Sequence, residues 1–173
     1  PINNSEKLWS SVDRIAESDF QLKVENMSSN PCFAQFSINY SVSGFDFFTR
    51  NFNQKVKNTM YTSASWLDNE TPDKERLIRS QQILFDLSEI YARRFRKQLL
   101  IDRKKISKGP QIAESINKDI MNDFAEERAA FEKESKGGLL TEVLSKWEEK
   151  IKLELADLNE FRFDNTEKIK LEK

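Results

Sequence analysis

The sequence contains no histidine among its 173 residues. This absence excludes Ser-His-Asp and Cys-His nucleophile systems, histidine general bases and histidine-containing zinc sites. The single cysteine, Cys32, allows no intrachain disulfide and favours a reducing compartment, so we expect a cytoplasmic protein. We predict no catalytic residue, no metal ligand and no cofactor.

Glycine and proline are also scarce, at four residues each. Four glycines are too few for a Gly-rich phosphate loop, and a sandwich or barrel with many tight turns would need more of both residues. No apolar run approaches the 18 residues of a membrane-spanning helix. Charge, in contrast, is abundant: 33% of the residues are charged and the net charge is −1, a balance typical of long helices with interleaved acids and bases.

The N-terminal third of the chain changes its hydrophobic period twice. Apolar residues at helical spacing predict a first helix over residues 6–18. Apolar residues then alternate in residues 20–27 and 32–42, which predicts two strands joined as a hairpin. Over residues 45–66 a spacing of four between apolar side chains predicts another helix.

Three longer helices are predicted in the rest of the chain. The first follows Pro72 and reaches about residue 106, the second covers residues 111–135, and the third runs from Leu140 to Leu158. Short connections make neighbouring helices antiparallel. The sequence therefore predicts a mainly α fold with a small β element: long antiparallel helices, as a helical hairpin or bundle, and an N-terminal β-hairpin.

We expect a single domain over residues 1–173, because the length fits one domain and no linker divides the chain. Within it, an N-terminal helix and β-hairpin over residues 1–45 would pack on a helical body over residues 45–160. The tail over residues 161–173 would fray or form a small β-hairpin of its own.

The charges are unevenly distributed along the chain. Residues 71–110 carry a net charge of +6, whereas residues 111–173 carry −5. On a helical wheel, four cations of the basic segment fall within about 60° and form a stripe about 22 Å long. Together with the cations that flank them, they give the candidate nucleic-acid-binding residues Arg93, Arg94, Arg96, Lys97, Arg103, Lys104, Lys105 and Lys108.

Two interpretations of this basic ridge stay open. Cations at this density attract a nucleic-acid backbone and release its counterions. The same stripe is also typical of a solvated helix face, partly neutralised by acids of the following helices. An anionic membrane surface is favoured less, because Trp and Phe do not lie beside the basic stripe as they would on an interfacial helix.

The last predicted helix carries its apolar residues at heptad-like spacing, which indicates a coiled-coil contact. This contact is either the seam of a homodimer, a groove for a partner helix, or an intramolecular contact with the helix over residues 111–135. The candidate partner-interface residues are Leu140, Leu144, Trp147, Ile151, Leu155 and Leu158.

These features favour a non-enzymatic, intracellular helical protein that acts through protein–protein interactions, as an adaptor or regulator and as a homodimer. The alternative is a nucleic-acid-binding protein that uses the basic ridge at residues 93–108. No membrane span is predicted.

Overall fold

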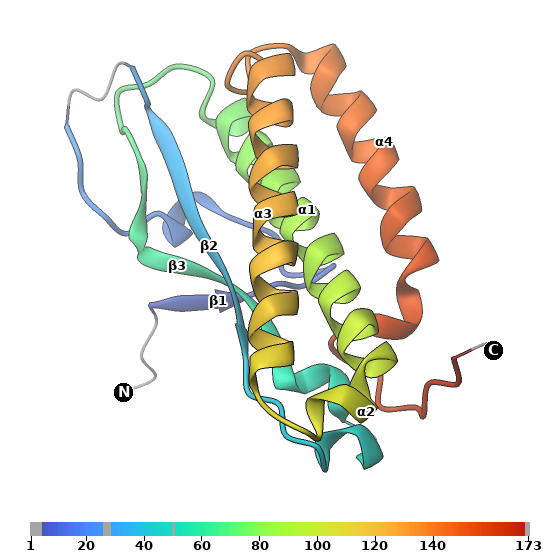
Figure 1. Cartoon of the computed structure of the whole chain (residues 1–173). Coiled ribbons are helices and arrows are strands. Elements are labelled where there is room, and N and C mark those ends of the chain that lie inside the picture. Colours follow the sequence, from blue (N-terminus) through green and yellow to red (C-terminus); the bar gives the residue numbers. More distant parts are fainter. Residues whose placement is uncertain (1–4, 26–28, 50, 172–173) are drawn as a thin grey trace.

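The computed structural model describes residues 5–25, 29–49 and 51–171. In this part of the chain a small antiparallel sheet is covered on one face by long helices (Figure 1). The prediction of a mainly α fold with a small β element is confirmed.

The sheet has three antiparallel strands in the order β1-β3-β2. The central strand β3 (Val56–Leu67) pairs along its length with β2 (Cys32–Tyr40), with one irregularity between Phe33 and Gln35. The short strand β1 (Glu6–Leu8) pairs with the other edge of β3. Alternate residues of β2 are buried, so its period of two gives the sheet one apolar face.

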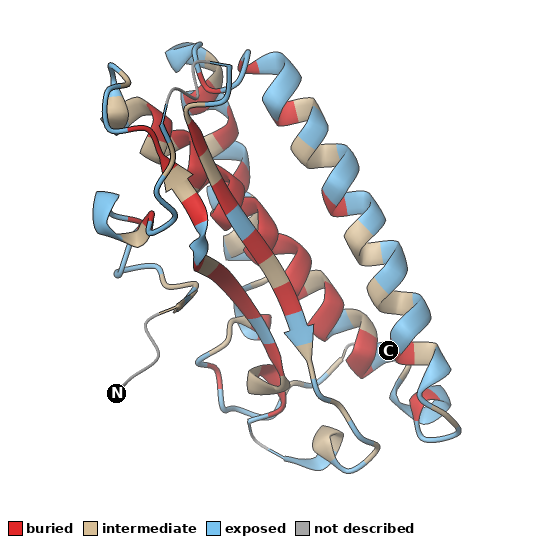
Figure 2. Ribbon diagram, turned by 90° about the vertical axis from the view of Figure 1, so that its left-hand side faces the viewer, coloured by how far each residue is buried: buried red, intermediate tan, exposed pale blue. Residues whose placement is uncertain are grey.

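The helix α1 (Lys74–Ile101) lies at the centre of the fold. One of its sides packs on the sheet, where Phe85 stacks on Phe36 with ring centroids 4.8 Å apart. Its other side receives α3 (Gln111–Glu134) and α4 (Thr141–Asp157). Figure 2 shows the buried residues concentrated along the facing strands and the helix that they cover, α1. Most residues of α3 and α4 are exposed or half-buried.

Two predicted elements near the N-terminus are wrong. Residues 6–18 form no helix: β1 is followed by an irregular segment that leads to the short 3-10 turn η1 (Glu17–Asp19). Residues 20–25 form no strand, and residues 26–28 lie outside the described residues. The hairpin partner of β2 is β3, so the sheet takes its central strand from the segment that the sequence assigns to the helical body.

The helix predicted over residues 45–66 is also wrong. This segment forms the 3-10 turns η2 (Asp46–Phe48) and η3 (Phe52–Lys55), followed by β3. The inward-facing positions of β3 include polar residues such as Asn58, whose side-chain oxygen accepts a hydrogen bond from Ser88 Oγ at 2.9 Å. Because buried polar side chains interrupt the apolar alternation of β3, its period of two is hidden in the sequence.

The three long helices are close to their predicted positions, but the first is shorter than expected. It ends at Ile101, and after Asp102 the chain forms the separate short helix α2 (Arg103–Ile106). The described tail up to Leu171 contains the 3-10 turn η4 (Asn159–Phe161) and no strand, so no tail hairpin forms there.

The turn between α3 and α4 depends on glycine. Lys136, Gly137 and Gly138 all have positive φ angles, of 52°, 68° and 86°. A side chain on Gly137 would meet no atom within 4 Å, whereas a Cβ on Gly138 would lie 2.6 Å from Ser80 Oγ of α1. Gly138 therefore allows both the backbone conformation and the close approach of this turn to α1.

We predict that Gly138→Ala destabilises the protein more than Gly137→Ala. Both substitutions add a side chain to a left-handed backbone, which costs about 1–2 kcal/mol. Only Gly138→Ala also forces a contact with the buried Ser80, which adds at least about 1 kcal/mol. Urea unfolding of both variants measures the difference, and equal stabilities would contradict this account of the turn.

Candidate functional site

Two arginines of the predicted basic ridge are buried, which corrects the expectation that they face solvent. Arg93 is 5% exposed and Arg96 is fully buried. From the helical wheel, we expect both arginines on a side of α1 that faces solvent. In the structure, the strand β3 and the end of α4 cover that side. Neither guanidinium can contact a phosphate backbone in this fold.

Glu89 holds both arginines at the centre of the molecule. Its Oε1 accepts a hydrogen bond from Arg93 Nε at 3.1 Å and another from Arg96 Nη1 at 2.9 Å, and its Oε2 accepts one from Asn58 at 3.3 Å. The carboxylate itself is 1% exposed. Two cations thus share one buried anion.

The arginines then reach beyond α1 to the backbone of three other segments. Arg96 donates to the carbonyl of Val56 at 2.7 Å and to that of Phe161 at 2.9 Å, which attaches β3 and η4. Arg93 donates to the carbonyl of Leu155 at 2.7 Å and attaches α4. We call Glu89, Arg93 and Arg96 the Glu89 cluster.

The other six cations of the predicted ridge are in two different environments. Arg94 forms an ion pair with α4, and the other five lie on the exposed surface. Arg94 donates to Glu154 of α4 at 2.6 Å and lies over the Tyr91 ring. Since α1 ends at Ile101, the remaining five cations form no continuous stripe. All five are exposed, and among the described residues only Lys105 forms an ion pair, with Asp102 at 2.7 Å. The five are Lys97, Arg103, Lys104, Lys105 and Lys108.

The predicted partner interface on α4 is mostly covered within the chain. Leu144, Trp147 and Ile151 are buried, and the Trp147 ring meets Phe131 of α3 edge-on with centroids 5.4 Å apart. Leu155 and Leu158 are half-buried, and Leu140 is 38% exposed. This face is therefore an intramolecular contact, made chiefly with α1 rather than with α3, and it is not free to form a coiled-coil seam.

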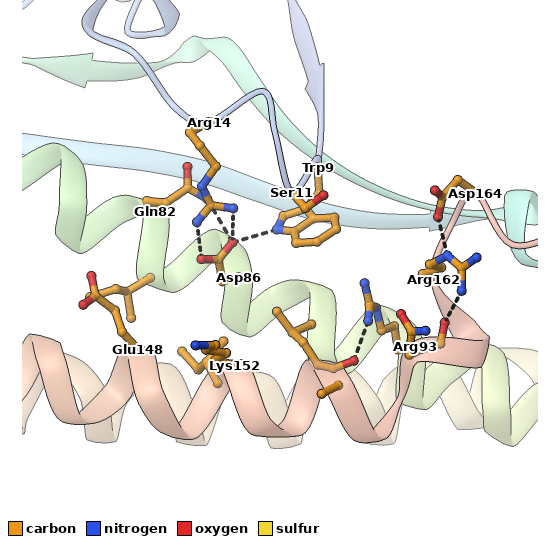
Figure 3. A pocket seen from close by; sticks show the side chains of 15 residues that line it. Trp9, Ser11, Arg14, Gln82, Asp86, Arg93, Glu148, Lys152, Arg162 and Asp164 are labelled. Carbon is orange, nitrogen blue, oxygen red and sulfur yellow. Dashed lines mark hydrogen bonds and ion pairs between the residues drawn. The ribbon is translucent and has the colours of Figure 1, made fainter.

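A groove of about 490 Å³ lies between α4, α1 and the segment that follows β1 (Figure 3). We call it the α1–α4 groove. Its volume is within the range of ligand-binding sites in proteins. Its α4 wall is one face of that helix, formed by Glu148, Ile151, Lys152, Leu155 and Ala156, and it is continued by Asn159 of η4.

Asp86 of α1 anchors the opposite wall. Its carboxylate accepts hydrogen bonds from Trp9 Nε1 at 2.8 Å and from both terminal nitrogens of Arg14, and Figure 3 shows the two side chains converging on it. Gln82 donates to the same carboxylate and accepts a hydrogen bond from the Ile15 amide at 2.7 Å. The segment after β1 is thereby fixed on α1.

Most charged groups of the groove are already paired. Glu148 accepts hydrogen bonds from Arg79, and Arg162 pairs with Asp164 at 3.1 Å. Arg93 lies under the Trp9 ring, 5.4 Å from its centroid. Among the described residues, Lys152 is an exposed cation of the groove whose side chain forms no ion pair or hydrogen bond, so it is available to an anionic ligand group.

The groove offers apolar and charged contacts. No thiol lines it, and Cys32 is buried in the sheet, where burial raises the pKa of its thiol to about 12. In the described parts of the chain, no three acidic or cysteine side chains gather in a way that could hold a metal ion. No helix among the described residues is long and apolar enough to cross a membrane.

Comparison of the chain with protein-family models, with curated proteins and with solved structures found no match. The function is therefore argued from the site itself.

Sequence reasoning missed the groove because its walls come from distant segments. Trp9 and Arg14 fit an expected helix, and Asp86 resembles any exposed acid on an amphipathic helix. The Trp9 side chain is a signal in the sequence that could have pointed to this site. Its indole N–H needs a hydrogen-bond acceptor when the ring is buried against a helix.

We predict that Glu89→Gln destabilises the protein by about 3–5 kcal/mol, because it leaves two buried guanidinium groups without their counter-charge. The matched control is Glu132→Gln, which breaks the partly exposed pair between Arg128 and Glu132 on α3. That change costs at most about 1 kcal/mol. Urea unfolding at neutral pH compares the two variants, and similar losses would show that the Glu89 cluster has no special role.

We also predict a pH dependence from Glu127, which accepts hydrogen bonds from Tyr91 of α1 and Lys150 of α4. Partial burial alone would raise the pKa of Glu127, but the two hydrogen bonds outweigh it and lower the pKa below its ordinary value of 4.5. A lowered carboxyl pKa stabilises the fold fully above pH 4.5, and this contribution is lost as the pH falls through the folded-state value.

The difference in unfolding free energy between the native chain and Glu127→Gln should therefore be largest near neutral pH and shrink in acid. Glu126→Gln, at the exposed neighbouring position, is the control and should show a difference close to zero at every pH. A loss for Glu127→Gln that stays constant or grows on acidification would contradict the assignment.

Proposed function

We propose that the protein is a non-enzymatic binding protein that holds a short extended segment of a partner protein in the α1–α4 groove. The observation that carries the proposal is the α4 wall, whose five positions in α4 follow the helical repeat and, with Asn159 of η4, line one hollow. From Glu148 to Asn159 this wall is about 16 Å long. That length matches about five residues of an extended peptide.

The chemistry of the groove specifies what this segment would contain. Ile151, Leu155 and the Trp9 ring offer apolar contacts for one or two aliphatic side chains. Lys152, exposed and unpaired, favours a carboxylate next to them. The other charged groups of the groove already have partners within the chain, so they would orient the segment without a large desolvation cost.

In the nucleic-acid alternative, Arg93 and Arg96 would not contact the ligand, because both are buried in the Glu89 cluster. Its five exposed cations are still available, and their role is a prediction. A homodimer also stays a prediction, but it would have to use a surface other than the buried α4 face. The cytoplasmic location rests on the sequence alone.

We predict that peptides selected for binding to the intact chain contain a carboxylate beside an aliphatic residue and occupy this groove. The probe is a displayed library of random peptides, panned against the native chain. Selected peptides should bind Ala156→Trp at least about tenfold more weakly, because the indole fills the groove, and Lys152→Glu should weaken binding through charge reversal.

The matched control is Ala129→Trp, which adds the same side chain at an exposed position of α3 outside the groove. Peptide affinity for this variant should equal that of the native chain. Selected peptides that bind Ala156→Trp and the native chain equally would contradict the proposal.

A further inference from the structure

The connection between β2 and β3 exposes two aromatic side chains at one end of the molecule. Phe45 is 84% exposed and Phe48 is 88% exposed. Phe47 lies between them and turns inward, where its ring packs on Phe52 with centroids 5.0 Å apart. The outward direction of Phe45 and Phe48 is therefore fixed by an anchored turn.

This turn lies directly against the exposed basic segment. The backbone of Gly44 is so close to Ser107 that a Cβ on the glycine would be 3.5 Å from the serine Cβ. Both exposed phenylalanines line one hollow together with Lys108, and Phe48 lines a second hollow together with Arg103. The aromatic rings and the cations form one surface, although more than fifty residues separate them in the sequence.

We call this surface the tip. It lies at the lower end of the molecule in Figure 1, where α2 and the β2–β3 connection meet, opposite the α3–α4 turn. Its members are Phe45, Phe48, Arg103, Lys104, Lys105 and Lys108.

The tip carries an excess of positive charge. Two acids beside it are engaged: Asp46 pairs with Lys55 at 3.3 Å, and Asp102 pairs with Lys105 at 2.7 Å. A third acid, Glu167, lines the hollow of Phe48 and Arg103 together with the cation Lys168. In the described structure Arg103, Lys104 and Lys108 form no ion pair. Two of these cations, Lys108 and Arg103, line the hollows of the exposed rings.

We propose that the tip docks on an anionic phospholipid surface. Apolar side chains next to Lys and Arg are the combination that interfacial membrane binding requires, since the rings enter the headgroup boundary while the cations remain with the lipid phosphates. The tip lies at one end of the long helices α1 and α3 (Figure 1).

A single-stranded nucleic acid shares part of this chemistry, because its phosphates bind cations and its bases stack on aromatic rings. It needs, however, a charged channel that follows several nucleotides. The tip cations lie on one short helix and the turn after it, which favours the lipid surface.

The proposal is tested by sedimentation of the intact chain with phospholipid vesicles. One set contains phosphatidylcholine alone, and the other contains about 30% phosphatidylserine. We expect binding to the anionic vesicles only, and we expect it to weaken as salt is raised. Binding to neither set, or equal binding to both, would overturn the proposal.

Substitutions separate the tip from the rest of the surface. Phe45→Ser combined with Phe48→Ser should lower vesicle binding at least about tenfold. The control is Val12→Ser combined with Leu153→Ser, which removes two other exposed apolar side chains, 88% and 60% exposed, and should leave binding unchanged.

A second pair of variants tests the charge. Lys104→Glu with Lys108→Glu should abolish binding, whereas Lys133→Glu with Lys146→Glu changes the net charge equally at the opposite end and should retain it. All these side chains are exposed, so the variants should unfold at the same temperature as the native chain.

The competing outcome is binding of single-stranded nucleic acid. Fluorescence anisotropy of labelled single-stranded DNA and RNA measures it under the same salt conditions. Oligonucleotide binding that the tip variants abolish, with no vesicle binding, would overturn the lipid proposal and assign the tip to nucleic acid. Vesicle binding that all four double variants share equally would also overturn it. Neither result bears on the α1–α4 groove, because none of the tip residues lines that groove.

Discussion

The fold depends on one buried carboxylate that is shared by two arginines. Glu89 and its partners lie where α1 meets β3, α4 and η4, and the guanidinium groups bind the backbone of all three. Burying two cations with one anion is costly in itself, and it is offset here because Arg93 and Arg96 also donate to main-chain carbonyls. Two arginines of the most basic segment of the chain are thus buried, where they connect α1 to the neighbouring segments.

The long helices could be predicted from the sequence because their apolar residues keep a helical period over many turns. The strand β3 could not, because the polar side chain of Asn58 points toward α1 and finds its hydrogen-bond partners there. The prediction that Arg93 and Arg96 belong to an exposed basic ridge is wrong for a related reason. A helical wheel identifies the side opposite Phe95, but it cannot show that α1 is covered on more than one side, and so that Arg93 and Arg96 lie among backbone carbonyls.

Both candidate surfaces arise from segments that only the fold brings together. Arg14 and Asp86 are far apart in the chain, yet their ion pair helps to close one wall of the α1–α4 groove. Phe45 and Lys108 likewise line one hollow at the tip. The sequence placed Arg103, Lys104, Lys105 and Lys108 in a basic ridge, but the aromatic side chains that would complete a membrane-binding surface are missing from their own segment.

The central claim is that the Glu89 cluster joins the sheet, α1 and α4 into a single cooperative unit. Native-state hydrogen exchange of the intact chain tests it most directly, amide by amide, in increasing denaturant. The account predicts that amides in β3, the middle of α1 and the end of α4 exchange through one common opening, with the free energy of global unfolding. A separate opening of α4 or β3 at clearly lower free energy, while α1 stays protected, would contradict it.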